Sequence, residues 1–549
     1  MTYPFYGANL GADNYYTNEC PFINRLSMSS APFNDTAACD PVTLLPTKAG
    51  SVSRQVPLDP IDTSIVTNPT SHDYVFLCDA NVASVSTPWG TVKPVNGRAT
   101  FTIKSASTGV GLVITATGPV TKMAFMRLEH EQLYLSGEIF NPDFLTRVSP
   151  FGPLRLLDWN ATNADYWPAR RPLPTDANFN DATGGMAAEI AGALAQKLGV
   201  KLWYPIHHLM PDSDIMATAM ALASYGAEVD FEWSNEYGWT YHRTYAYAAA
   251  AAHYNLTKAA YSDVLSYYGW RAGQVAKLVS SVSPKFKINL ASQASDGASN
   301  LPAILKGWDE SGAPRSLIAG YANASYLNMN DFAKIEDFVA KYVPMMNADD
   351  KAGFIALLQS KVAPLALRHQ KAAAACAAAG IAYKVYEGDM SLYLQAPWVT
   401  DANVRNALLN WILPIAHSEP VAGIIMSSLQ TAWDAGATEV CFFELSGPGS
   451  QYGVWGEMPH ITLPAYPIYY LLTAQNQATK DKLAAEAAAA AAAARKAAED
   501  KAAADAAAAA EANRLAAIAK AEARAKEFAA IQAEMAVLTT RMQTYLAAA

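Results

Sequence analysis

The chain has 549 residues, of which 51% are apolar and 16% charged, and this length allows roughly two to four domains with large hydrophobic cores. Its net charge of −9 argues against nucleic acid as a partner, because phosphate backbones attract basic surfaces. No apolar run reaches the length of a membrane span, so we expect no transmembrane helix.

The five cysteines show neither a CxxC pair nor a metal-type spacing, which favours free thiols and assembly in a reducing compartment. A Cys20–Cys39 disulfide in an N-terminal loop is the alternative. The opening "MTYPFYGANLGADNYY" lacks the basic and apolar regions of a signal peptide. We therefore expect synthesis in the cytoplasm and, for work outside the cell, a route other than ordinary secretion.

Residues 1–150 are rich in Pro, Thr, Ser, Val and Asn, and they contain short alternating runs such as "RATFTIKS" and "GLVITATG". Alternation with a period of two is typical of strands that bury one face. We expect a β-sandwich-like module here, whose first segment packs on the domain that follows.

Residues 151–478 alternate short apolar runs with Ala-rich helical stretches, which is the pattern of repeated βα units. The expected strands are 154–159, 200–209, 229–236, 285–292, 316–322, 382–388 and 439–445, with an eighth near "GGMAAEI" at 184–190. Apolar runs indicate parallel strands covered on both faces. We predict an α/β fold, a (β/α)8 barrel whose C-terminal strand ends build the active site. A doubly wound open sheet is the alternative.

Residues 479–549 are dominated by Ala and lack Gly and Pro, which predicts one helix of roughly 100 Å at about 1.5 Å per residue. Near its end, apolar residues follow one another at spacings of 3, 4, 3, 4 and 3: Phe528, Ile531, Met535, Leu538, Met542 and Tyr545. This heptad repeat predicts a coiled coil. We expect a homo-oligomer, a trimer, joined through this helix; a solvated tail is the alternative.

Two glutamates fall where predicted strands end. Glu236 closes "VDFEWSNE", and Glu387 ends the run "KVYE". A retaining glycosidase needs two carboxyl groups about 5 Å apart, one a proton donor and the other a nucleophile. In a barrel they can come from strands distant in sequence, because the strand ends meet at one rim. Alternation puts Glu232 on the same side as Glu236 but deeper, as a structural carboxylate. Glu444, in "CFFELSGPG", is the rival nucleophile.

The segment "FEWSNEYGW" resembles the fourth-strand signature of clan A glycoside hydrolases, in which an Asn-Glu pair supplies the acid/base. Other segments are similar to motifs of a subgroup of uncharacterised barrel proteins described as cellulose-binding: "YGANLGADNYYTNECPFINRL", "FNPDFLTRVSPFGPLRLLDWNATN", "GGMAAEIAGALAQKLGVKLWYPIHHLMPDSD", "YEGD" and "YGVWGE". The resemblance covers about residues 5–475 and leaves out the helical tail.

Carried over by position, the resemblance implies that Glu236 is the acid/base and Glu387 the nucleophile. It ranks Glu444 behind Glu387, because the clan usually ends its eighth strand in an aromatic platform. The implied substrate-binding residues are Asn235 for a sugar hydroxyl, Tyr321 as a hydrogen-bond donor to the nucleophile, His207, His208, Asn163 and Trp239 around the sugar, and Trp455 as a stacking surface.

The sequence departs from the family pattern at two positions. Asp389 replaces the second Gly of the subgroup's "YEGG", which adds a like charge near Glu387. Tyr237 follows Glu236 where many clan members have Pro.

Two functions follow from this reading. The first is a retaining glycoside hydrolase that acts on a surface or extracellular polysaccharide or oligosaccharide. The second is a catalytically weak carbohydrate-binding adhesin, or a structural protein, with the same barrel. The sequence has no HExxH motif and no phosphate loop, so we expect neither a metal nor a cofactor.

The absent signal peptide, the glycan-directed barrel and the predicted coiled coil together suggest a phage tail fibre or spike. Such a protein is assembled in the host cytoplasm and has other virion proteins as partners. A bacterial protein that is retained in the cytoplasm, or exported without a classical signal, is the alternative.

Overall fold

The computed structural model describes residues 3–12, 17–30, 35, 37–40, 43–60, 72–103, 108–164, 167, 180–181, 185–238, 242–293 and 297–548. In these residues eight parallel strands close into a barrel, in the order β1, β9, β12, β13, β14, β15, β17 and β19. Their bounds are β1 (Tyr6–Asn9), β9 (Leu154–Arg155), β12 (Leu202–Ile206), β13 (Val229–Trp233), β14 (Lys287–Ala291), β15 (Ile318–Ala324), β17 (Tyr383–Glu387) and β19 (Ala437–Phe442). The predicted (β/α)8 barrel is confirmed.

Each of the seven apolar runs named above contains or overlaps one strand of this barrel, but the eighth strand was expected in the wrong place. Gly185–Met186 forms β11, which pairs with β10 (Asn180–Asp181) outside the barrel. The remaining barrel strand is β1, which pairs with β9 on one side and β19 on the other. Its four residues are too few to show a periodic pattern, and the next barrel strand lies far along the chain.

Between β1 and β9 the chain builds a sandwich of two antiparallel sheets, within the described residues. One sheet holds β2 (Gly50–Pro57), β7 (Gly109–Ala116), β4 (Val82–Thr87) and β5 (Gly90–Val92), and the other holds β6 (Arg98–Ile103), β3 (His72–Cys78) and β8 (Met123–Arg127). Along β6, buried and exposed residues alternate, so the apolar side chains of Ala99, Phe101 and Ile103 face the core. The sandwich is therefore an insertion between the first two strands of the barrel.

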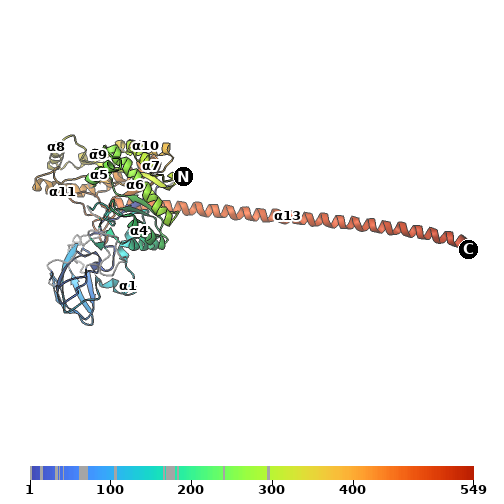
Figure 1. The fold of residues 1–549 in the computed structure, drawn as a ribbon, viewed down its shortest axis with the longest axis horizontal. Coiled ribbons are helices and arrows are strands. Elements are labelled where there is room, and N and C mark those ends of the chain that lie inside the picture. The colour runs from blue at the N-terminus through green and yellow to red at the C-terminus, as the bar shows by residue number, and fades with distance from the viewer. Residues whose placement is uncertain are drawn as a thin grey trace. The chain divides into compact units, whose positions relative to one another are not determined.

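Helices connect the barrel strands and lie around them (Figure 1). The α-helices are α1 (Glu131–Leu135), α2 (Pro142–Val148), α3 (Ala188–Leu198), α4 (Asp212–Ser224), α5 (Arg243–His253), α6 (Tyr261–Val282), α7 (Gly297–Glu310), α8 (Ile335–Asn347), α9 (Lys351–Gln359), α10 (Val362–Ala379), α11 (Ala402–Ala416), α12 (Glu419–Asp434) and α13 (Pro467–Ala548). Short elements complete the set: η1 (Arg25–Met28), η2 (Leu128–His130), η3 (Arg315–Leu317), β16 (Leu327–Asn328) and β18 (Met390–Ser391).

In the described part of the chain no single helix is both long and apolar enough to cross a membrane. Helices α11 and α12 meet those criteria of length and composition only as a pair, and the pair is bent by 73°.

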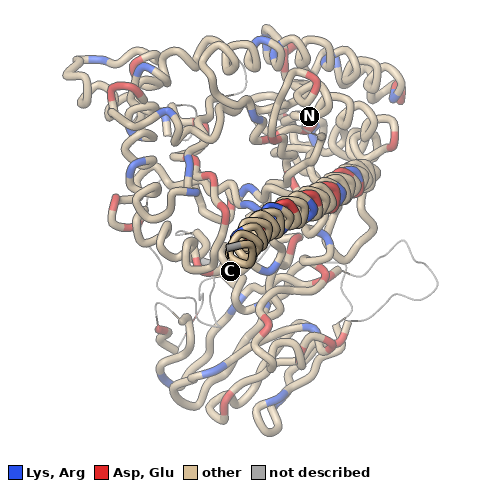
Figure 2. Tube along the Cα trace, turned by 90° about the vertical axis from the view of Figure 1, so that its right-hand side faces the viewer, with Lys and Arg blue, Asp and Glu red and all other residues tan. Residues whose placement is uncertain are grey.

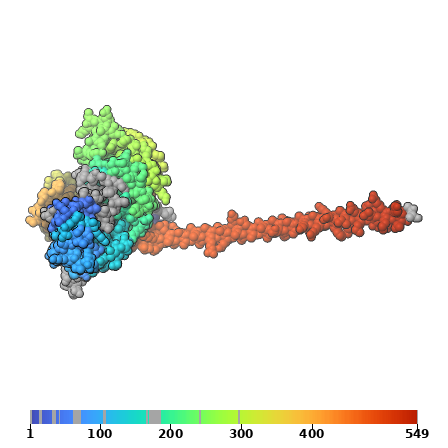
Figure 3. Space-filling model, turned by 60° about the horizontal axis from the view of Figure 1, so that its bottom comes forward, coloured from blue at the N-terminus to red at the C-terminus, as the bar shows by residue number. Residues whose placement is uncertain are grey.

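The chain divides into two compact units, residues 1–477 and residues 478–549. The first turns of α13 belong to the first unit, where Ile468 and Leu472 are buried. There Asn476 accepts a hydrogen bond from the Tyr6 backbone N–H at 2.6 Å and donates one to the Tyr6 carbonyl at 2.9 Å. The second unit is the rest of α13, a single helix whose described side chains are exposed from Lys480 onward (Figure 3).

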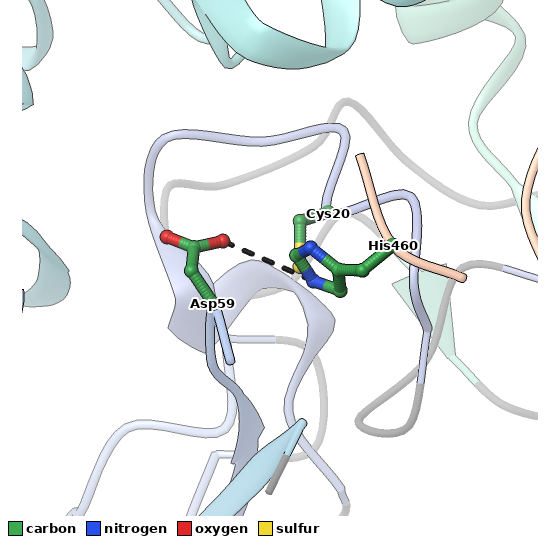
Figure 4. A group of neighbouring side chains, drawn as sticks. All are labelled: Cys20, Asp59 and His460. Carbon is green, nitrogen blue, oxygen red and sulfur yellow. Dashed lines mark hydrogen bonds and ion pairs between the residues drawn. The ribbon is translucent and has the colours of Figure 1, made fainter. Parts of the chain in front are cut away.

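A buried ion-pair cluster joins the sandwich to the barrel. Asp59, just beyond β2, receives two hydrogen bonds of 2.9 Å from Arg25 and one of 3.1 Å from Arg127. His460, from the segment between β19 and α13, lies 3.9 Å from the same carboxylate, beside Cys20 (Figure 4). Burial opposes the negative charge of Asp59, but the facing cations outweigh it and hold its pKa well below the usual range.

We predict that Asp59→Asn lowers the free energy of unfolding by about 3–5 kcal/mol, because Arg25 is left buried without its counter-charge. The depressed pKa makes this stabilisation fully present above the unfolded carboxyl pKa near 3.9 and lost as the pH falls below it. Urea unfolding of the wild type and the variant at pH 7 and in acid measures both effects.

Asp309→Asn is the matched control, because Asp309 forms an exposed pair with Arg315 at 2.7 Å. This substitution is expected to lower the free energy of unfolding by less than about 1 kcal/mol. Equal costs for the two variants would show that the buried cluster does not hold the sandwich on the barrel.

Candidate active site

The segment that carries Glu236 turns sharply as it leaves the barrel. Ser234 and Glu236 both have positive φ angles, of 65° and 41°. Side chains avoid this left-handed region at a cost of about 1–2 kcal/mol each. The Ser234 N–H donates to the Ile206 carbonyl at 2.7 Å, and Tyr237 packs on Trp233, so the turn is fixed on both sides. The strained turn holds Glu236 at the C-terminal end of the barrel.

Arg155, from β9, is the centre of the site and is fully buried. Its guanidinium donates to both carboxylate oxygens of Glu232 at 3.1 Å, to Asn9 at 3.1 Å, to Asn235 at 2.8 Å and to Glu387 at 2.6 Å. An arginine has five N–H donors, and each has an acceptor here. Arg155 therefore positions its neighbours and has no donor left for a ligand.

Glu232 is a buried structural carboxylate. Both of its oxygens bind Arg155, and Trp203 donates its indole N–H to Oε2 at 2.7 Å. Burial raises its pKa, and Arg155 counteracts this effect. Glu232 thus anchors Arg155 beneath the rim of the barrel.

Glu387, which ends β17, is held by two donors. Arg155 donates to Oε1 at 2.6 Å, and the Tyr326 hydroxyl donates to Oε2 at 2.8 Å. The prediction that Tyr321 makes the second bond is wrong. The Tyr321 hydroxyl instead shares a 2.5 Å hydrogen bond with Ser292 and donates to the Gly297 carbonyl at 2.7 Å. Tyr321 lies within β15, too deep in the barrel, whereas Tyr326 follows the end of that strand.

Glu236 has a different environment from Glu387. Its Oε1 accepts one hydrogen bond, from the Tyr386 hydroxyl at 2.7 Å. Burial and the negative charge of Glu387 raise the pKa of Glu236 to about 7, although Tyr386 and Arg155 act in the opposite direction. The charge of Glu387 therefore acts on Glu236, and Glu236 binds a proton near neutral pH.

Asn235 and Asn163 are brought together, as expected of two residues at one site. Asn235 Oδ1 accepts from Arg155, and its amide donates to Asn163 Oδ1 at 3.2 Å. The arginine fixes which end of the Asn235 amide is oxygen. The amide nitrogen therefore faces Asn163 and keeps a second N–H for another acceptor.

His207 and His208 follow β12, and their rings stack with centroids 4.5 Å apart. His207 Nδ1 accepts from the Leu209 N–H, so its Nε2 carries the proton and donates to the Ala164 carbonyl at 2.9 Å. Burial and the neighbouring His242 lower the pKa of His208 to about 3, so it is neutral. Trp239, expected nearby, lies outside the described residues.

Trp455 packs against the tyrosine that holds Glu387. Its ring centroid lies 6.4 Å from that of Tyr326, 5.6 Å from Tyr393 and 5.3 Å from Phe443. A Cβ on Gly453 would lie 2.2 Å from the indole, so only glycine leaves room for the ring. The structure thus places Trp455 one aromatic ring away from Glu387.

More carboxyl groups surround Glu387 than the sequence led us to expect. Burial and the charge of Glu387 raise the pKa of Asp158 to about 7. The rival Glu444 has its pKa raised well above the usual range, by burial and by Asp158, Glu387 and Asp389. Burial likewise raises the pKa of Asp389 to about 8, and Glu457, fully buried, lies beside it with both oxygens without a hydrogen bond. Protonated carboxyl groups are therefore available at this end of the barrel at neutral pH.

The sequence pattern missed Arg155, Tyr326, Tyr386 and Asp158. A signal existed for two of them, since "LRLLDW" places Arg155 and Asp158 in an apolar strand run where an unpaired charge is costly. The two tyrosines carry no such signal, because aromatic residues are common in any core.

One group in the described part of the chain has the spacing of metal ligands, and it is the Cys20, Asp59 and His460 cluster. Arg25 and Arg127 already neutralise Asp59 there. His460 Nδ1 accepts the Thr462 N–H at 3.2 Å, so its Nε2 carries the proton and offers no lone pair to a cation. The group is an ion-pair cluster, and all five cysteines are free.

The sequence matches no protein-family model and no curated protein. Solved structures that align with it include a 4-O-α-L-rhamnosyl-β-D-glucuronidase from Fusarium oxysporum, with 12% identity over 61% of this chain and 64% of that one and a TM-score of 0.36. A xylanase from Cellvibrio japonicus aligns with 13% identity over 61% and 94% and a TM-score of 0.34. A β-glucuronidase from Bacteroides uniformis aligns with 8% identity over 85% and 51% and a TM-score of 0.31.

These neighbours are glycoside hydrolases. Likenesses this weak carry no argument about this chain, so the fold rests on the strand order of the barrel. The chemistry likewise rests on the side chains that the barrel brings together.

Proposed function

We propose that this protein is a retaining glycoside hydrolase that cuts a surface or extracellular polysaccharide. The observation that carries the proposal is the contrast between two glutamates at one end of the barrel. Glu387 is bound by a cation and a phenol, whereas Glu236 has one neutral donor and a pKa raised to about 7. Unequal environments of this kind separate a nucleophile from a general acid.

In the first step one carboxylate oxygen of Glu387 attacks the anomeric carbon of the sugar. The bond from that carbon to the leaving oxygen breaks, and Glu236 gives its proton to that oxygen. In the second step the ionised Glu236 takes a proton from water. The water oxygen attacks the anomeric carbon, the ester bond to Glu387 breaks, and both carboxyl groups return to their initial states.

The coupling between the two glutamates changes the role of Glu236 between the steps. While Glu387 is charged, it raises the pKa of Glu236 and favours the protonated acid. Once Glu387 is esterified, that charge is gone and the pKa of Glu236 falls. Glu236 is then the base that the second step needs.

The other residues of the site suit a neutral or hydroxyl-rich sugar. Asn235 has a spare amide N–H for a hydroxyl, and Trp455 offers an apolar ring next to Tyr326. Asp158 adds a carboxyl group that both donates and accepts hydrogen bonds when protonated. Arg155 has no free donor, so it cannot bind an acidic sugar.

We expect Glu387→Gln and Glu236→Gln to lower turnover of a polysaccharide by at least about 10²-fold while binding is retained. The substrate is found first, by screening capsule and exopolysaccharides with the wild type. Azide, added as an external nucleophile with an activated glycoside, then assigns the two roles in the alanine variants. With Glu387→Ala the glycosyl azide product is expected to have inverted configuration. With Glu236→Ala it is expected to have retained configuration.

Glu444→Gln is the matched control and keeps most of the activity. Azide rescue of Glu444→Ala with inversion would make Glu444 the nucleophile instead. Binding without turnover by the wild type on every glycan tested would favour the second function, a carbohydrate-binding adhesin.

The pH profile gives a second prediction. Because Glu236 must carry a proton in the first step, kcat/KM declines as the pH rises through its pKa of about 7. The Tyr386 hydroxyl lowers that pKa by donating to the ionised carboxylate. Tyr386→Phe therefore moves the alkaline limb to higher pH, whereas Tyr321→Phe, which changes a hydroxyl bound to Ser292, leaves it in place. An alkaline limb that stays fixed in Tyr386→Phe contradicts the assignment of Glu236.

The proposed setting is a phage tail, where the barrel would meet host surface polysaccharide. The long exposed helix α13 supports this setting, since it provides an assembly element apart from the catalytic unit. We expect the protein to co-purify with phage particles, as measured by mass spectrometry of virions banded in a density gradient. Its presence in uninfected cells and absence from particles would favour a bacterial protein.

A further inference from the structure

The end of α13 carries an apolar stripe that nothing in the described part of its own chain covers. We name these six residues the C-terminal seam, with their exposed fractions: Phe528 63%, Ile531 49%, Met535 62%, Leu538 62%, Met542 63% and Tyr545 82%. Their alternating spacing of three and four residues keeps them on one side of the helix. Six large apolar side chains exposed in a row mark an interaction surface.

The charges further along the same side of the helix limit how a second copy can lie. Extending the heptad towards the N-terminus brings Arg524, Arg514, Asp500 and Lys496 to the positions that the seam residues occupy. Lys, Arg, Asp and Glu alternate along this part of α13 (Figure 2). In a parallel, in-register coiled coil each of these charges would face its own copy, which is unfavourable. The same repulsion counts against a parallel trimer.

We propose that two copies of this chain associate through their C-terminal seams in an antiparallel coiled coil. In antiparallel pairs each first heptad position packs against the fourth position of the other helix. The seam is self-complementary in that arrangement: Phe528 meets Tyr545 of the second copy, Ile531 meets Met542, and Met535 meets Leu538. The three layers are repeated by the two-fold axis, so every seam residue is covered and none of the upstream charges faces its own copy.

The residues that flank the seam fit the antiparallel register. It sets Glu534 beside Arg541 of the second copy, and the symmetry repeats this pair. It also lays Leu546, which is 70% exposed, over Ala525 of the second copy. A parallel register would pair Glu534 with Thr539 and Glu527 with Gln532, and it would form no ion pair. Charge complementarity therefore selects the antiparallel dimer.

Association through the seam does not depend on the proposed catalytic activity. It joins two carbohydrate-directed units into one particle. On a polymer with repeating sugars, two linked units raise the effective concentration of the second binding event.

The oligomeric state of the full chain at micromolar concentration tests the proposal, by sedimentation equilibrium in moderate salt. The wild type is expected to be a dimer. Glu534→Arg or Arg541→Glu alone weakens the dimer by roughly tenfold, because two ion pairs become two like-charge contacts, and the double variant restores it. Lys526→Glu is the control of matched charge change, because Lys526 lies on the side of the helix away from the seam.

Cysteine cross-linking tests the direction of the helices. A mixture of Phe528→Cys and Tyr545→Cys chains forms a disulfide-linked dimer in the antiparallel register, whereas Phe528→Cys alone forms none above the wild-type background. Efficient cross-linking of Phe528→Cys with itself, a monomer at all concentrations, or a mass of three copies would each overturn the proposal.

Discussion

One buried guanidinium organises the polar interior of this barrel. Arg155 has no access to water, and a buried cation is tolerated only when anions and hydrogen-bond acceptors surround it. Its four acceptor residues come from three strands and the turn after one of them: Asn9 from β1, Glu232 from β13, Asn235 just beyond β13, and Glu387 from β17. The hydrogen bond from Arg155 therefore fixes the orientation of Glu387, the proposed nucleophile. The catalytic geometry follows from the need to neutralise one charge.

The same constraint explains why the carboxyl groups of the site differ so much. Arg155 is a single positive charge, and Glu232 and Glu387 already share it. Burial and the negative charge of Glu387 raise the pKa values of Glu236, Asp158 and Glu444. A group of acids around one cation thus includes members that bind a proton near neutral pH. Protonated members can donate to a sugar oxygen, which ionised ones cannot.

The sequence predicted those parts of the fold that depend on local patterns. Apolar runs located seven barrel strands, and strand ends together with a family resemblance located Glu236 and Glu387, whose roles stay predictions. β1 was missed because four residues carry no periodicity. The resemblance pointed to Tyr321, and Tyr326 was missed because register cannot be read from one strand: β15 and β17 shift register between Asn323 and Ala324, just before the strand ends. The role of Arg155 depends on contacts between strands far apart in the sequence.

The position of β1 affects how the protein is made. This strand is synthesised before the other strands of the barrel, yet its neighbours are β9 and β19, and Asn476 near the start of α13 hydrogen-bonds its backbone. The ribosome adds roughly 5–20 residues per second, so tens of seconds pass between the synthesis of β1 and that of β19, its last partner. Until β19 is made the barrel cannot close, and the edges of the growing sheet can pair with other chains. The sandwich has all its strands by residue 127, so it can fold in that interval and keep the waiting strand close to a formed body.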